Sequence, residues 1–123
     1  MLIGKDFDKI EFSFLGFDFV EPNALYGDVL ICIIALYFSY KVRKNFPSTL
    51  FFKSWSNFFL VFGVGFLFGG LGHFLFNYFG VPGKYPAWYS GLFASYFIER
   101  AMVSIYPLKE RRRLFSLIIK TKL

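Results

Sequence analysis

Residues 54–80 read SWSNFFLVFGVGFLFGGLGHFLFNYFG, a run of 27 residues that contains no Lys, Arg, Asp or Glu and a single histidine, His73. About 20 apolar residues in a helix are enough to cross the roughly 30 Å of hydrocarbon in a bilayer. The run therefore predicts a membrane-spanning helix, which we place at residues 54–78. It is the strongest membrane signal in the chain.

Weaker signals of the same kind lie on both sides of this run. Residues 24–40, ALYGDVLICIIALYFSY, are apolar except for Asp28 near their start. Residues 87–106 have Trp and Tyr at their ends, as is typical of helices that end at a membrane–water interface, but they also contain Glu99 and Arg100. We therefore predict an all-α membrane protein with about three transmembrane helices in one domain, residues 24–106.

The composition excludes an ordinary soluble domain. Hydrophobic residues make up 56 % of the 123 residues and aromatic residues 24 %, whereas only 18 % are charged. Soluble domains carry about a quarter charged residues, and a chain this short could not bury its 20 Phe side chains away from water. We expect an integral, multi-pass protein in contact with the lipid bilayer, in the inner membrane if the cell is bacterial.

The basic residues predict the orientation. They are frequent between the first two predicted helices and in the tail, whereas the loop between the second and third helices has only Lys84. Because basic loops stay in the cytoplasm, we predict the N-terminus outside and the C-terminus inside. The same positions indicate that the net charge of +6 serves anionic lipid headgroups and not nucleic acid. The basic residues concerned are Lys41, Arg43, Lys44, Lys53, Lys109, Arg111, Arg112, Arg113, Lys120 and Lys122.

The two ends of the chain lie outside the predicted transmembrane helices. Residues 1–23 carry five acids, Asp6 and Asp8 among them, and no continuous apolar core, so they are not a cleavable signal peptide. Their loose alternation fits a short strand or an interfacial segment outside the membrane. Residues 107–123 fit a basic cytoplasmic tail, an amphipathic helix on the inner leaflet, or the start of a fourth helix that this chain lacks.

Small residues mark the faces through which the predicted helices would pack. Gly65 and Gly69 form a GxxxG step that Gly72 continues, and Gly91 and Ser95 repeat the spacing on the third helix. Small residues let two membrane helices approach closely. We therefore predict association with further copies of the chain or with another membrane protein.

Four ionisable residues fall at membrane depth, where such residues are functional candidates. Asp28 and His73 both lie toward the outer leaflet, so they could pair, relay a proton or share a metal, or simply hydrogen-bond each other or water. Glu99 and Arg100 lie on the third predicted helix, and the long side chain of Arg100 can reach the cytoplasmic face.

Two stretches resemble the alkaline ceramidases of the CREST superfamily of seven-helix membrane hydrolases. Residues 18–23, DFVEPN, with the later Asp28, resemble that family's calcium-binding entry segment, and residues 68–73, FGGLGH, resemble its Ser-x-x-x-His motif. The resemblance implies a catalytic zinc on His73 and calcium held by Asp18, Glu21, Asn23 and Asp28. Gly69 stands where the family has serine, no Asp follows His73 at the expected distance, and the closing HxxxH is absent.

Two functions remain open from the sequence. The first is an accessory or structural membrane subunit, or a fragment, that packs through its small-residue faces. The alternative is a metal-dependent lipid amidase of the ceramidase type, or the N-terminal part of one, in which metal activates water for attack on an amide.

Overall fold

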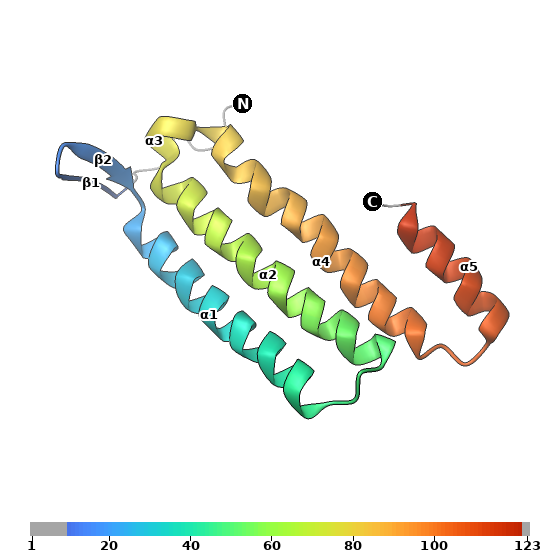
Figure 1. The fold of residues 1–123 in the computed structure, drawn as a ribbon. Coiled ribbons are helices and arrows are strands. Elements are labelled where there is room, and N and C mark those ends of the chain that lie inside the picture. Colours follow the sequence, from blue (N-terminus) through green and yellow to red (C-terminus); the bar gives the residue numbers. More distant parts are fainter. Residues whose placement is uncertain (1–9, 122–123) are drawn as a thin grey trace.

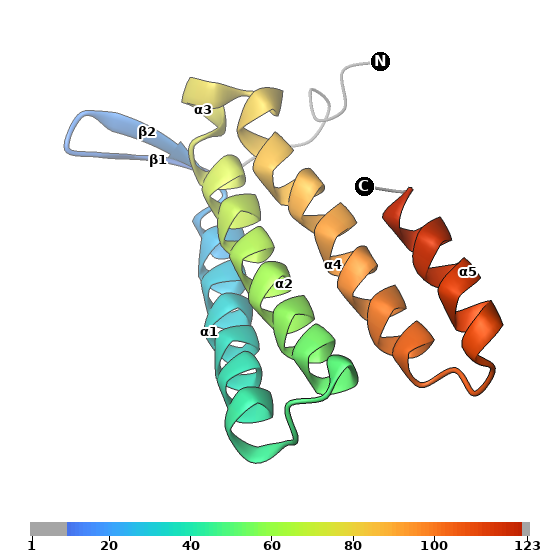
Figure 2. The same cartoon turned by 45° about the vertical axis from the view of Figure 1, so that its right-hand side comes forward.

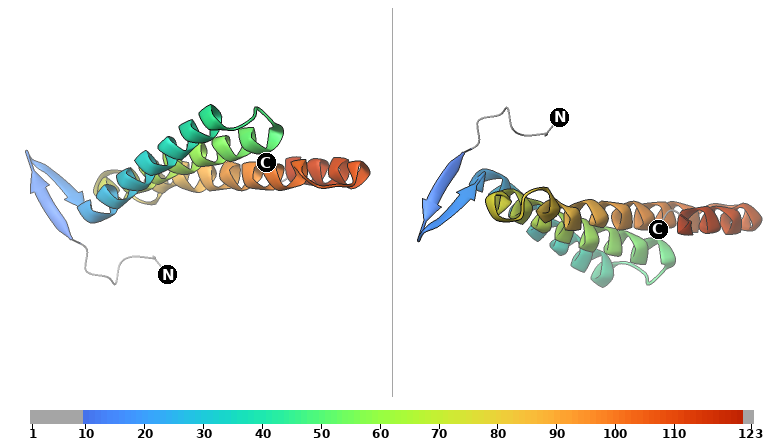
Figure 3. Two further views of the ribbon diagram at one scale, coloured as in Figure 1. Left: turned by 90° about the horizontal axis from the view of Figure 1, so that it is seen from below. Right: turned by 90° about the horizontal axis from the view of Figure 1, so that it is seen from above.

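The computed structural model describes residues 10–121, so the predictions that concern Asp6, Asp8 and Lys122 lie outside the described residues. Four long helices follow one another in a row (Figure 1): α1 (Pro22–Asn45), α2 (Leu50–Phe74), α4 (Tyr85–Ser104) and α5 (Lys109–Lys120). Helix α1 packs on α2, α2 on α4, and α4 on α5. Figure 3 shows that α4 and α5 share a plane, from which α1 diverges toward the α1–α2 loop.

A short antiparallel hairpin precedes α1. Strands β1 (Glu11–Phe14) and β2 (Phe17–Val20) are joined by Leu15 and Gly16, both with positive φ, as a tight two-residue hairpin turn requires. The ring of Phe19 stacks on Phe74 at the end of α2, with 4.3 Å between ring centroids. Of the two alternatives for this segment, the strand is the one that the structure contains.

The connection between α2 and α4 lies at the same end of the molecule as the hairpin. It consists of a single turn, α3 (Phe76–Phe79), and a 3-10 turn, η1 (Val81–Lys84). Figure 2 shows the hairpin and α3 at one end, and the α1–α2 and α4–α5 connections at the other. The N–H of Asp18 donates a 2.9 Å hydrogen bond to the hydroxyl of Tyr78, which ties the hairpin to α3.

The predicted helices are present, with shifted ends. The first predicted helix, 24–40, extends in the structure to Asn45, since nothing before Phe46 and Pro47 stops it. The predicted 54–78 begins four residues earlier, after Thr49, whose hydroxyl accepts a hydrogen bond from the N–H of Phe52. The predicted 87–106 corresponds to α4, and within 107–123 the helix α5 turns back along α4.

The buried positions of α1, α2 and α4 are occupied by small residues. Every buried residue of α2 is a serine or a glycine, and the buried residues of α1 are Cys32, Ala35 and Ser39. Helix α4 buries only Ala94 and Ala101. Large apolar side chains lie on the outside instead: Leu92 of α4 and Ile33 of α1, for example, are more than half exposed. This distribution is the reverse of the one in soluble domains.

The structure confirms that the chain is mostly helical. Among the described residues, α1 and α2 are long and apolar enough to cross a membrane, by length and composition alone. Helix α4 has 20 residues but includes Glu99 and Arg100, which lower its hydropathy. A third crossing is therefore part of the proposal made below.

Candidate functional site

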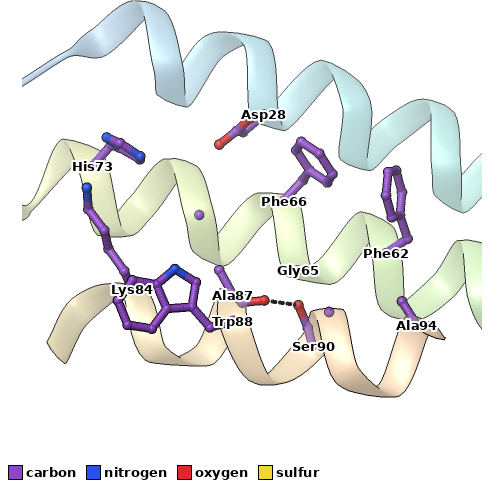
Figure 4. Close-up of a pocket in the computed structure, with 12 residues that line it drawn as sticks. Asp28, Phe62, Gly65, Phe66, His73, Lys84, Ala87, Trp88, Ser90 and Ala94 are labelled. Atoms are coloured by element: carbon purple, nitrogen blue, oxygen red, sulfur yellow. Dashed lines mark hydrogen bonds between the residues drawn. The ribbon is translucent and has the colours of Figure 1, made fainter. Parts of the chain in front are cut away.

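A cleft with a volume of about 320 Å³ lies between α2 and α4, with α1 contributing one residue at its outer end (Figure 4). It is polar at the end near the hairpin and apolar toward the middle of the helices. The lining residues are Asp28, Phe62, Gly65, Phe66, Gly69, His73, Lys84, Ala87, Trp88, Ser90, Gly91 and Ala94.

Three ionisable side chains from three elements meet at the polar end. Asp28 comes from α1, His73 from the last turn of α2, and Lys84 from η1. Figure 4 shows the Lys84 side chain extending toward His73, with Asp28 farther along the cleft. Lys84 Nζ also lies 5.1 Å from the centroid of the Phe76 ring, so an aromatic face stabilises this cation.

The glycines of α2 make room for Asp28. A Cβ atom at Gly70 would lie 2.9 Å from Asp28 Cβ, and one at Gly69 would lie 3.3 Å from Asp28 Oδ2. Any larger residue at either position would displace the carboxylate. Within residues 10–121, the Asp28 carboxylate has no hydrogen bond and no ion-pair partner inside 4 Å.

His73 pairs with Glu21 and not with Asp28. Its Nδ1 lies 2.7 Å from Glu21 Oε2, and both side chains are more than one-third exposed. Glu21 has a φ of 51° and directly precedes the Pro22 that starts α1. The pair therefore joins the hairpin–α1 junction to the end of α2, and it leaves Nε2 of His73 available to the cleft.

The apolar end has small residues on its floor and aromatic rings on its wall. Gly65 lies directly against the Ser90 side chain, whose hydroxyl donates a 2.6 Å hydrogen bond to the carbonyl of Ala87. The rings of Phe62 and Phe66 lie 4.7 Å apart along α2. A Cβ atom at Gly91 would meet nothing within 4 Å, so the cleft is open there.

The residues implied for calcium do not converge. Asp18 accepts a hydrogen bond from Ser13 in the hairpin, Glu21 pairs with His73, and Asn23 is exposed in the first turn of α1. Within residues 10–121, no three His, Cys, Asp or Glu side chains form a group that could hold a metal ion. As placed, these residues fit neither the implied zinc nor the implied calcium.

The structure places the predicted packing residues at different contacts. Gly65 faces α4, Gly69 lies between Asp28 of α1 and Ala87 of α4, and a Cβ atom at Gly72 would lie 2.7 Å from the carbonyl oxygen of Gly83 in η1. Gly91 borders the cleft, and Ser95 donates a 3.0 Å hydrogen bond to the Gly91 carbonyl within its own helix.

Sequence reasoning missed the residues of α2 that face α1. They are Ser56, Gly63 and Gly70, spaced seven residues apart. A Cβ atom at Gly63 would lie 2.9 Å from Ala35 Cβ. A seven-residue spacing keeps small residues on one side of a helix over two turns, and a search for GxxxG alone does not find it.

Sequence reasoning also missed a hydrogen-bond network between α1 and α2, near the end away from the hairpin. Ser39 Oγ donates a 2.9 Å hydrogen bond to the Ser56 carbonyl, and Ser56 Oγ donates a 3.0 Å bond to the Ser39 carbonyl. Arg43 donates to Ser56 Oγ at 2.7 Å and to Asn57 Oδ1 at 2.9 Å. The signal in the sequence is a serine on each of two helices, one of them followed a turn later by arginine.

The two charges predicted within α4 lie away from the cleft. Arg100 borders a second cavity of about 210 Å³ between α4, α5 and the start of α2, with Arg112 and Lys120. Its guanidinium lies 5.9 Å from the centroid of the Tyr96 ring. Glu99 is half-buried on α4 and lines neither cavity.

Comparison with other proteins identifies a family and nothing closer. No curated protein and no solved structure matches the chain. The matched region, residues 24–123, includes α1 from its third residue, the other long helices and the cleft, but not the hairpin. On this match the chain belongs to a family described as a family of unknown function, DUF6962.

Proposed function

We propose that this chain is a multi-pass membrane protein that crosses the bilayer three times, with α1, α2 and α4, and serves as a structural or accessory subunit of a membrane assembly. The observation that carries the proposal is the reversed distribution of residues, with small and polar side chains inside and large apolar ones outside. The hairpin and α3 lie outside the cell or compartment, and the α1–α2 and α4–α5 connections lie in the cytoplasm.

The reversed distribution supports lipid as the solvent. An interior of Gly, Ala, Ser and Cys removes little apolar area from water, so in water this fold would lack its main source of stability. Its exposed Leu, Ile and Phe side chains would also form a larger apolar surface than monomeric soluble proteins tolerate. In a bilayer, close packing of small residues is itself the usual source of helix association.

The charges at the two ends support the orientation. Arg43 and Lys44 lie in the last turn of α1, Lys53 lies in the first turn of α2, and Lys109 starts α5, all at one end of the row. The opposite end has Lys84 together with acidic residues of the hairpin. Basic residues on one side are the pattern that holds loops in the cytoplasm.

A second groove, almost entirely apolar, supports the role as a subunit. It has a volume of about 460 Å³ and lies between α2 and α4, lined by Leu60, Val61, Val64, Phe68, Pro86, Tyr89, Ser90, Phe93 and Phe97. A groove of this kind between two helices can receive an apolar helix from another chain. We propose that a second copy or another membrane protein packs there.

The topology is tested with cysteines in a Cys32→Ala background. Ser48→Cys lies in the α1–α2 loop, Val81→Cys in η1 and Leu108→Cys just before α5. We expect a membrane-impermeant maleimide to label Val81→Cys in intact cells, and the other two only after permeabilisation. Labelling of Leu108→Cys from outside would show that α4 does not cross and would overturn the three-span topology.

The subunit role is tested by photo-crosslinking in native membranes. A benzoylphenylalanine at Phe93, in the apolar groove, is compared with one at Ile34, on the outer face of α1; the two native side chains are 49 % and 54 % exposed. We expect a protein crosslink from Phe93 and only lipid adducts from Ile34. The mass of the product tells a second copy from a different protein, and lipid adducts at both sites would reject the subunit role.

The lipid amidase of the sequence analysis gains no support from the geometry, because the implied ligands do not converge. We therefore derive no metal-dependent step. Elemental analysis of the folded protein tests the prediction directly, since zinc or calcium in stoichiometric amount would restore it as a candidate.

A further inference from the structure

We propose that the cleft between α2 and α4 binds a phospholipid with a primary ammonium in its headgroup, of the phosphatidylethanolamine type. The ammonium pairs with Asp28, the phosphate lies between Lys84 and His73, and an acyl chain follows the small-residue floor. This site goes beyond the proposed subunit role, although it rests on the proposed location in a membrane.

The carboxylate of Asp28 is the group that would bind the headgroup ammonium. It projects into the cleft in a space that Gly69 and Gly70 keep free, and within residues 10–121 it has no hydrogen bond and no ion-pair partner inside 4 Å. A carboxylate at membrane depth is costly unless it is paired. A ligand ammonium would supply both the opposite charge and N–H donors.

Lys84 and His73 select a phosphate at the same end. Lys84 provides a fixed positive charge at the mouth of the cleft, and Phe76 holds its ammonium in place. Nδ1 of His73 lies 2.7 Å from Glu21 Oε2, and an imidazolium in this position donates to Glu21 through Nδ1 and to a ligand phosphate through Nε2. A carboxylate and an ammonium at one end of the cleft match a zwitterionic headgroup. Asp28 would repel a purely anionic lipid, and Lys84 would repel a purely cationic amphiphile.

The rest of the cleft matches an acyl chain. Below the charged end the lining consists of small residues and the rings of Phe62 and Phe66. Clefts of a few hundred Å³ with apolar walls and a few polar groups at one end are the usual form of small-molecule sites. A bilayer supplies such a ligand at high local concentration.

The test is native mass spectrometry of the full-length protein after reconstitution in vesicles with equal parts of phosphatidylethanolamine, phosphatidylcholine and phosphatidylglycerol. We expect one retained phosphatidylethanolamine, preferred about tenfold over the other two, as one charge-assisted hydrogen-bonded pair would give. Equal retention of the three lipids, or preference for phosphatidylglycerol, would overturn the proposal.

Matched variants locate the lipid. Asp28→Asn removes the charge at constant volume, with Glu110→Gln on α5 as its control. Gly91→Phe fills the open part of the cleft, with Gly27→Phe as its control, because a Cβ atom meets nothing within 4 Å at either glycine. We expect Asp28→Asn to abolish the preference for phosphatidylethanolamine, Gly91→Phe to abolish retention, and the controls to keep both. Unchanged retention in Gly91→Phe would place the lipid elsewhere and reject the site.

Two further measurements distinguish loss of the lipid site from misfolding of a variant. Thermal unfolding in detergent shows whether each variant is folded, and Gly91→Ala, a smaller change, should weaken retention less than Gly91→Phe if the cleft is the site. A protein with the expected cysteine-labelling topology that retains no phosphatidylethanolamine would reject this inference and leave the proposed function standing.

Discussion

Ser54 and Ser56 lie two residues apart on α2 and are both buried, but only one of them is hydrogen-bonded. Ser56 exchanges hydrogen bonds with Ser39 and accepts one from Arg43. The hydroxyl of Ser54 has no partner among the described residues. A buried polar group without a partner costs free energy, whereas a paired one contributes.

We therefore expect opposite effects from the same substitution at the two serines. Ser56→Ala should lower the free energy of unfolding by about 1–2 kcal/mol, because it leaves Arg43 Nε without its acceptor. Ser54→Ala should leave it unchanged or raise it slightly. Unfolding by SDS in mixed micelles measures both values, and equal losses at the two positions would contradict the assignment.

At the polar end of the cleft, the sequence predicts Asp28 and His73 as candidates, but neither Lys84 nor the pairing of His73. Asp28 and His73 stand out because ionisable residues are rare in apolar runs, and the structure does bring both to one cleft. The partner of His73 is Glu21, 52 residues away. That pairing depends on the left-handed backbone at Glu21 and on how the hairpin docks, and hydropathy carries no information on either.

At the scale of elements, α2 is organised by two rows of small residues on different sides. Ser56, Gly63 and Gly70 face α1, whereas Gly65 faces α4, Gly69 lies between α1 and α4, and Gly72 lies against η1. The two rows allow one helix to be approached closely from both sides, which explains its position in the middle of the row.

Substitution of single glycines should separate packing from helix propensity. In Gly63→Ala the new Cβ atom would lie 2.9 Å from Ala35 Cβ, so α1 and α2 must move apart, at a cost of about 1–3 kcal/mol. Gly27→Ala meets nothing within 4 Å and should stabilise by up to about 1 kcal/mol through helix propensity. The same SDS titration measures both, and a stabilising Gly63→Ala would show that α1 and α2 do not touch there.

The existence of α1, α2 and α4 could be predicted from the sequence, because apolar runs of this length with so few charges have few other structures. Their ends could not. The charged segment Lys41–Asn45 continues α1 because it contains no helix-breaking residue, and Thr49 caps α2 before the charged Lys53. Hydropathy finds where lipid begins, whereas helices stop where caps, glycine or proline stop them.

At the scale of the molecule, the charge difference between the two ends should determine the orientation. Replacing Lys41, Lys44 and Lys53 together by Gln leaves Arg43, in the last turn of α1, as the one basic residue near the α1–α2 connection, against Lys84 at the other end. The excess of basic residues at the cytoplasmic ends of α1 and α2 is then lost, although the basic residues of α5 remain.

We expect this triple variant to give a mixed population, in which Ser48→Cys becomes partly accessible to an impermeant maleimide in intact cells. The matched triple Lys→Arg variant keeps the charge and should keep the loop inside. If the Gln variant retains a single orientation, α5 or the hairpin decides the topology instead.

The interior of serines, glycines and alanines also reverses the way this protein tolerates change. In a soluble domain, buried positions fail mainly when a side chain becomes smaller. Here most buried side chains are already near the minimum, so there is almost nothing left to remove. A complete substitution map of this chain should show an upper size limit along its contact seams, and broad freedom among large apolar residues on its outer surface.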